Sequence, residues 1–156
     1  MLYLVRHAKA GSRSTWVGDD RERPLNDAGR LQAAALATRL SPLVTGRLVS
    51  SPYLRCMETL APLAAALSMT VEADERLAEE TGFAGALTLL STLPEGSVLC
   101  SHGDVIPDTI EALERRGCAF AGAPDWRKAS VWVLGREASG AITRAAAWPP
   151  PMTAGV

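Results

Sequence analysis

The stretch Leu2-Tyr3-Leu4-Val5-Arg6-His7-Ala8 decides how the rest of the chain is interpreted. Four apolar residues in a row, rich in strand-forming types, predict a strand buried in a parallel sheet. The strand runs into Arg6 and His7 and then into a polar loop that contains glycine. Because ligands bind outside the carboxyl ends of strands in open α/β sheets, these two side chains are candidates for a binding site. The alternative is an arginine and a histidine that only cap a strand, and this stretch alone does not decide between the two.

Length and composition set the class of protein. A chain of 156 residues with 47% hydrophobic and 21% charged residues fits one globular domain, which we expect over 1–148, followed by an extended proline-rich tail over 149–156. The net charge of -1 gives no overall attraction to a nucleic acid polymer. Three cysteines without metal-ligand spacing suit a reducing cytoplasm. With no long apolar run and no signal-peptide layout, we expect a cytoplasmic protein that binds no membrane, and its oligomeric state stays open.

Strand and helix patterns alternate along the chain. A long polar loop over 9–24 precedes a helix that Asn26 should cap, and long loops of this kind are usually functional or disordered. Pro62 should kink or split the helix that begins at Ser51-Pro52. Further helices are expected near 83–93 and 106–113, and further strands near 47–50, 70–72, 97–100, 130–134 and 141–148. The alternation predicts an α/β fold with a mainly parallel sheet.

Both histidines of the chain follow predicted strands, and two arginines accompany them. His7 follows Arg6 at the end of the first strand, and His102 ends the strand near 97–100. Arg55 lies in the first turn of the helix that follows another strand. Four donor or cationic groups at one rim of a sheet would repel one another unless an anion lies between them. Phosphate suits such a site because guanidinium groups bind its oxygens in pairs.

At this point the chain resembles the histidine phosphatase superfamily, which includes the phosphoglycerate mutases. Five pieces match in family order and cover roughly residues 1–115: Leu4-Val5-Arg6-His7-Ala8, Arg23-Pro24-Leu25 with Ala28-Gly29, Ser50-Ser51-Pro52-Tyr53-Leu54-Arg55 with Glu58-Thr59, Leu77 with Glu79, and Ser101-His102-Gly103. The small size is similar to that of SixA-type phosphohistidine phosphatases. The segment after His7 also resembles the phosphatase half of actinobacterial Nudix–histidine phosphatase fusions.

The resemblance implies a three-layer, phosphoglycerate mutase-like α/β/α fold and a phosphatase that needs no metal or other cofactor. His7 would be the nucleophile, Arg6 and Arg55 would hold the phosphoryl oxygens, and His102 would complete the pocket. The family's general acid would be Glu79. The expected partner is a phosphorylated small molecule or a phosphohistidine protein.

The identity of the acid is open at the level of sequence. Glu79 lies two residues after Leu77, as the family pattern requires. Glu80 is its neighbour and is expected to be solvated. Asp104 is a further candidate, although a carboxylate at the start of a helix also serves to offset the helix dipole.

The loop after the nucleophile departs from the family pattern, and this bears on the substrate. Many members have Gly-Glu-Ser after the histidine and an asparagine a little later, whereas this chain has Ala8-Lys9-Ala10 and Arg13. Lys9 and Arg13 therefore suggest a second anionic subsite, with a solvated basic loop as the alternative. Ser12 in the same loop and Gly103 at a helix start are the other expected substrate-binding residues.

Two other classes of function remain open. Two histidines and nearby carboxylates could form the site of a divalent metal hydrolase, although adjacent arginines argue against a cation. A phosphate-binding module without catalysis could use the same pocket. Resistance to chelators separates the first alternative from a histidine phosphatase, and formation of a phosphoenzyme separates the second.

Overall fold

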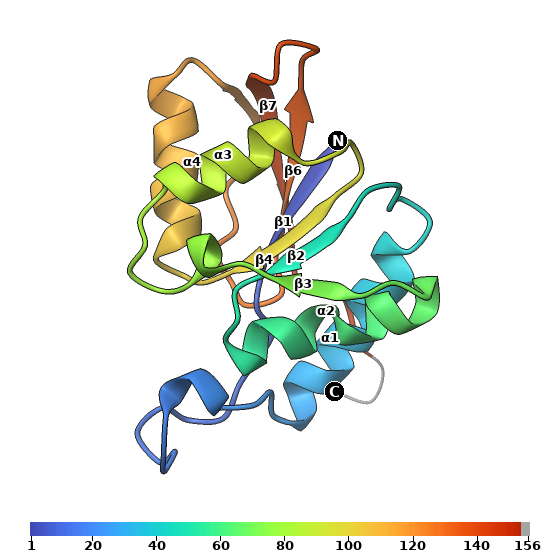
Figure 1. Cartoon of the computed structure of the whole chain (residues 1–156), viewed down its shortest axis with the longest axis vertical. Coiled ribbons are helices and arrows are strands. Elements are labelled where there is room, and N and C mark those ends of the chain that lie inside the picture. The colour runs from blue at the N-terminus through green and yellow to red at the C-terminus, as the bar shows by residue number, and fades with distance from the viewer. Residues whose placement is uncertain (154–156) are drawn as a thin grey trace.

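The computed structural model describes residues 1–153 of the chain, and Figure 1 shows its elements. In chain order these are β1 (Leu2–Arg6), η1 (Asp20–Glu22), α1 (Asp27–Leu40), β2 (Leu48–Ser50), α2 (Leu54–Leu67), β3 (Val71–Ala73), η2 (Glu75–Leu77), α3 (Ala84–Thr92), β4 (Val98–Ser101), α4 (Val105–Arg115), β5 (Ala119–Ala121), β6 (Val131–Arg136) and β7 (Ile142–Trp148). Here η marks a single turn of 3₁₀ helix. The predicted alternation of strands and helices is confirmed.

A seven-stranded sheet with the order β3-β2-β4-β1-β6-β7-β5 forms the middle of the molecule. The first four strands of that order are mutually parallel, as predicted from the alternating pattern. β6 is antiparallel to both β1 and β7. β5 was not predicted; it adds to β7 in parallel at the edge. The predicted fold class of a mainly parallel α/β sheet is confirmed.

Helices cover both faces of the sheet, so the fold has three layers. α1 and α2 lie on one face and α3 and α4 on the other (Figure 1). Each face has its own core of buried aliphatic side chains: one holds residues of α1 and α2, such as Leu36 and Leu60, and the other holds residues of α3 and α4, such as Leu90 and Ile110. Burial of these side chains is the main driving force for this arrangement.

α1 begins where predicted, and its buried face agrees only in part with the predicted one. Asn26 caps it by accepting a hydrogen bond from the backbone N–H of Gly29 at 2.8 Å. Helical spacing predicts an apolar face formed by Ala28, Leu31, Ala35, Leu36 and Leu40, but Leu31 is 45% exposed. The buried face keeps Leu36 and Leu40 and adds Gly29, Gln32, Ala33 and Ala37. The reason is a close approach to the chain after β1: a Cβ atom on Gly29 would overlap the Lys9 carbonyl, and the Gln32 side chain accepts a hydrogen bond from the Lys9 N–H at 3.0 Å.

α2 is one helix with Pro62 inside it, so of the two predicted outcomes, a kink or a split, the split is wrong. The proline removes one backbone donor, which costs stability in a helix interior. Leu60 and Leu63 on either side of it are fully buried in the core, and this packing favours the continuous helix.

The predicted proline-rich tail is only partly described. Residues 149–153 have no regular secondary structure, and the Pro149 carbonyl accepts a hydrogen bond from Arg39 at 3.2 Å. Residues 154–156 lie outside the described residues. None of the helices within 1–153 combines the length and hydrophobicity needed to cross a bilayer.

Candidate active site

The carboxyl ends of β1 and β4 bring the two histidines together. The strands pair in parallel with Arg6 opposite Ser101, so the residue after each strand is a histidine. The backbone N–H of His7 donates to the Ser101 carbonyl at 3.1 Å. The two imidazole rings meet edge to face, with their centroids 5.5 Å apart. The expectation that strand ends deliver these side chains to one rim is therefore met.

His7 is held in a form suited to nucleophilic attack. It is 5% exposed, and its Nδ1 lies 2.8 Å from the carbonyl oxygen of Ala8. Because a carbonyl can only accept a hydrogen bond, Nδ1 carries the proton and Nε2 keeps its lone pair.

The environment of His7 keeps the imidazole neutral. Burial lowers its pKa to about 3, helped by the charges of His102, Arg55 and Arg6 and opposed by the hydrogen bond to Ala8. Burial is thus a larger cause of the lowered pKa than the charges of the two arginines. The imidazole ring therefore stays neutral well below pH 7.

Three buried nitrogens around His7 have no hydrogen-bond partner within residues 1–153. They are Nε of Arg6, Nε of Arg55 and Nδ1 of His102. The other nitrogen of His102, Nε2, lies 2.8 Å from the Ser51 hydroxyl, which itself accepts from the Tyr53 N–H. Ser51 can therefore donate to Nε2, leaving the proton of His102 on Nδ1. A buried donor without an acceptor costs free energy, so this arrangement favours an anionic ligand.

Arg55 is fully buried at the start of α2 and contacts two carboxylates. Its Nη2 donates to Glu79 Oε1 at 2.7 Å and to Asp20 Oδ2 at 3.1 Å, and its Nη1 donates to the Asp20 carbonyl at 2.9 Å. Its guanidinium also lies over the Tyr53 ring, 4.9 Å from the centroid. These contacts fix the guanidinium while leaving Nε without a partner among the described residues.

Glu79 is a carboxyl group that lies against both Arg55 and His102. Besides Arg55, it contacts Arg13 at 2.9 Å, and its Oε1 lies 3.5 Å from His102 Nδ1. Asp104, by contrast, uses Oδ1 to cap α4 at Val105 and Oδ2 to accept the N–H of Glu80. This geometry favours Glu79 over Asp104, because both carboxylate oxygens of Asp104 accept hydrogen bonds from backbone N–H groups.

A hollow of about 480 Å³ opens in front of His7. Of the residues expected at the site, Arg6, His7, Ser12, Arg13, Glu79 and Gly103 line it, together with Glu80 and Asp104. Arg55 and His102 do not line the hollow, but both lie against Glu79, which does. Lys9 does not line this hollow, and the Arg13 guanidinium is paired with Glu79 rather than free.

The sequence argument missed three residues of the site: Arg23 and Lys128, which line the hollow, and Asp20, which contacts Arg55. Arg23 belongs to the motif Arg23-Pro24-Leu25. It is almost completely buried, and a buried arginine needs hydrogen-bond acceptors for its guanidinium. Its Nε donates to Asp20 at 2.8 Å and its Nη1 to the Gly11 carbonyl at 2.5 Å. Lys128 had no motif around it.

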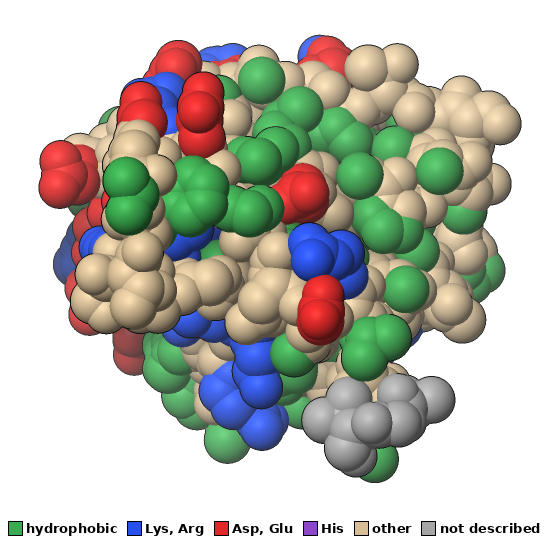
Figure 2. Space-filling model, turned by 90° about the horizontal axis from the view of Figure 1, so that it is seen from below, with side chains coloured by type: hydrophobic (Ala, Val, Ile, Leu, Met, Phe, Trp, Pro, Cys, Tyr) green, Lys and Arg blue, Asp and Glu red, His purple; other side chains and the backbone are tan. Residues whose placement is uncertain are grey.

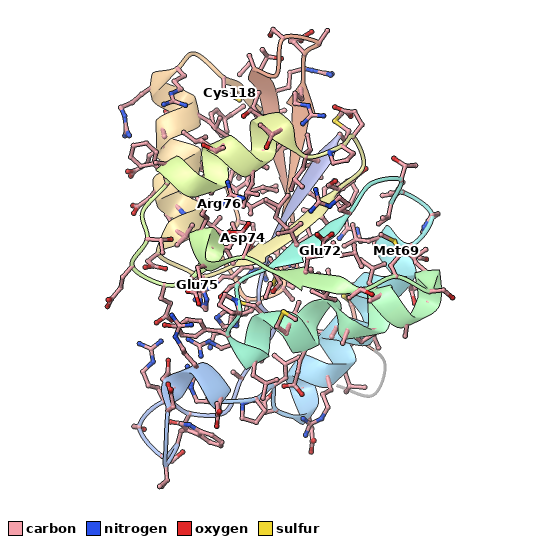
Figure 3. All side chains as sticks on the ribbon, viewed as in Figure 1. Met69, Glu72, Asp74, Glu75, Arg76 and Cys118 are labelled. Atoms are coloured by element: carbon pink, nitrogen blue, oxygen red, sulfur yellow. The ribbon has the colours of Figure 1, made fainter. Side chains whose placement is uncertain are left out.

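An ion pair connects the long loop over 9–24 to η2. Arg21 donates from both terminal nitrogens to Glu75, at 3.0 and 3.1 Å. Glu75 begins η2 and is labelled in Figure 3. Since η2 leads directly to Glu79, the same short segment holds the loop and carries the candidate acid.

Gly103 leaves room for the Arg6 guanidinium. A Cβ atom at this position would lie 2.7 Å from Arg6 Nη2 and 2.8 Å from Cζ. We expect Gly103→Ala to displace Arg6 and to lower kcat/KM by about tenfold to a hundredfold, since small misplacements of a binding group have effects of that size. Steady-state hydrolysis of p-nitrophenyl phosphate measures the effect.

Gly11→Ala is the matched control for that variant. Gly11 lines the same hollow, but a Cβ atom there would contact nothing within 4 Å. It should keep most of the activity. Equal losses in the two variants would contradict the steric role assigned to Gly103.

Comparison with known proteins agrees with this geometry. Residues 2–85 match the sequence pattern of the histidine phosphatase superfamily (branch 1). The chain belongs to the histidine phosphatase superfamily. An 8-oxo-(d)GTP phosphatase of Mycolicibacterium smegmatis is 36% identical over 139 residues, which are 85% of this chain and 43% of that protein. The chain spans less than half the length of such curated relatives.

Solved structures of other superfamily proteins share the fold. The protein histidine phosphatase SixA, complexed with tungstate, superimposes with a TM-score of 0.72 at 20% identity, covering 91% of this chain and 92% of that one. A protein assigned as a phosphohistidine phosphatase SixA, from Nakamurella multipartitia, gives a TM-score of 0.70 at 26% identity, covering 98% and 95%. This member of the histidine phosphatase superfamily therefore has the predicted phosphoglycerate mutase-like architecture.

Proposed function

We propose that this chain is a phosphatase that hydrolyses phosphomonoesters through a covalent phosphohistidine on His7. The observation that carries the proposal is a set of three buried N–H groups around a neutral imidazole, none of which has a hydrogen-bond partner in the described part of the chain. Fixed donors of this kind stabilise the negative charge on a transferred phosphoryl group without having to reorganise during the reaction.

In the first step, Nε2 of His7 attacks phosphorus and the bond from phosphorus to the leaving oxygen breaks. Arg6, Arg55 and His102 donate to the phosphoryl oxygens. The Glu79 carboxyl donates its proton to the leaving oxygen and becomes a carboxylate. In the second step, this carboxylate takes a proton from water, the water oxygen attacks phosphorus, and the bond from phosphorus to Nε2 breaks. Inorganic phosphate leaves and Glu79 regains its proton.

Three classes of substrate fit this chemistry: a small phosphomonoester, a nucleotide phosphate and a phosphohistidine protein. The relative from Mycolicibacterium smegmatis is named for a nucleotide substrate, and the SixA proteins for phosphohistidine. A release assay for inorganic phosphate across these three classes tests the proposal. Absence of release from all of them, in a protein that binds phosphate, would support a binding module instead.

Chelation provides a second test. The part of the chain that the structure describes contains no group of three or more His, Cys, Asp or Glu side chains placed to hold a metal ion. Because Arg6 and Arg55 would supply the positive charge and His102 a further N–H donor, we expect full phosphatase activity in a large excess of EDTA. Loss of activity on chelation, with recovery on adding zinc or manganese, would assign the protein to the metal-dependent hydrolases.

A further inference from the structure

A second hollow lies next to the one that contains His7, and the two share one residue. It measures about 470 Å³ and is lined by Lys9, Gln32, Arg127, Lys128, Pro150, Pro151, Met152 and Thr153. Lys128 lines both hollows. A molecule whose phosphoryl group lies at His7 could therefore extend past Lys128 into the second hollow.

The charge of this second hollow is strongly unbalanced. Its lining contains three cationic side chains and, among the described residues, no carboxylate. Neither Lys9 nor Lys128 has an acidic partner within residues 1–153. Arg127 pairs with Asp125 through Nε and Nη2, at 3.1 and 2.6 Å, which leaves Nη1 for another acceptor.

Holding Lys128 in its charged form at this position costs free energy. Burial lowers its pKa, and so do the charges of Arg6, Arg23, Arg55 and Arg13. An ammonium held among like charges is stabilised by an anion that contacts several of them together.

We propose that the second hollow binds a further anionic group on the leaving part of the substrate, such as the next phosphate of a nucleoside polyphosphate. The inference rests on the proposed function, because it places the transferred phosphoryl at His7. The apolar side chains of Pro150, Pro151 and Met152 complete the wall, so an anion joined to a less polar group suits the hollow better than a free anion. Figure 2 shows a face on which Lys and Arg side chains gather beside hydrophobic ones.

The position of Lys9 changes the interpretation of the loop. Sequence reasoning placed Lys9 and Arg13 in one second subsite. In the structure Arg13 lines the hollow of His7 and pairs with Glu79, whereas Lys9 lines the neighbouring one. Lys9, Arg127 and Lys128 therefore form the candidate subsite, and Arg13 does not belong to it.

The test compares binding of two probes by isothermal titration calorimetry, without need of turnover. One probe is inorganic phosphate, and the other is guanosine 5′-(β,γ-methylene)triphosphate, which the reaction cannot cleave at that bridge. A charged hydrogen bond in a partly desolvated site corresponds to about a tenfold change in affinity. Lys9→Ala should weaken the analogue by about this factor and leave phosphate affinity within about twofold. Lys128→Met should weaken both probes, because Lys128 lines both hollows.

Arg116→Ala is the matched control, since it removes one exposed positive charge at the end of α4 and should affect neither probe. Far-ultraviolet circular dichroism confirms that the variants are folded. Equal effects of Lys9→Ala on the two probes, or no effect on either, would overturn the second subsite. So would wild-type protein that binds phosphate as tightly as the analogue. Wild-type protein that prefers the analogue but cleaves no phosphoester would refute the proposed function and leave the subsite intact.

Discussion

His7→Ala should abolish turnover of p-nitrophenyl phosphate while the chain remains folded. The variant removes the nitrogen that attacks phosphorus, and the Nδ1 hydrogen bond to Ala8 that orients this ring is lost with it. The remaining donors can still bind phosphate but cannot form the covalent intermediate. Wild-type protein quenched during turnover should carry a phosphoryl group that is labile in acid and stable in base, and the variant should not.

Circular dichroism and thermal unfolding provide the control for the His7 variant, since a buried side chain is being truncated. Activity within tenfold of wild type in a folded His7→Ala protein would refute the phosphohistidine mechanism. A phosphoenzyme of the acid-stable kind would assign the nucleophile to a different residue type.

Arg55→Met should have the next largest effect on activity, a loss of kcat of about a hundredfold to a thousandfold. Methionine keeps much of the aliphatic volume at a fully buried position but removes all donors to the phosphoryl group. It also removes one of the two arginines that contact both Asp20 and Glu79, the other being Arg13, so both the loop and the candidate acid lose an anchor. Steady-state kinetics measures the loss, and denaturant unfolding measures the accompanying loss of stability.

Arg55→Lys is the matched control, because it keeps the charge but not the planar set of donors. It should recover only part of the activity, since one ammonium cannot contact Asp20, Glu79 and a phosphoryl oxygen in the geometry of a guanidinium. Full activity in Arg55→Met would refute a role of the guanidinium in stabilising the transferred phosphoryl group.

The central part of the site could be predicted from sequence because it depends on strand ends. His7 and His102 each follow a short run of apolar residues, and parallel pairing brings such ends to the same edge. Arg55 could be predicted for the same reason, since α2 begins just after β2. Local patterns determine these positions, so no knowledge of long-range packing was needed.

The residues that escaped prediction depend on packing between distant segments. Lys128 reaches the site from the segment between β5 and β6, and β5 itself is a short exposed strand with little hydrophobic pattern. The buried face of α1 was also predicted only in part, because its close contact with Lys9 through Gly29 leaves Leu31 exposed. Likewise, the division of Lys9 and Arg13 between two hollows follows from the path of the loop rather than from their spacing.

The place of β1 within the sheet bears on how the molecule loses activity when it is heated. β1 is hydrogen-bonded to β4 on one side and to β6 on the other, whereas β3 and β5 are the open edges. Amide protons in such an inner strand exchange with solvent only through large-scale opening, while edge strands fray at much lower free energy. Partial melting that releases β5 would therefore spare the strand that carries Arg6 and leads into His7, whereas release of β3 would disturb Glu79, which follows β3 through η2.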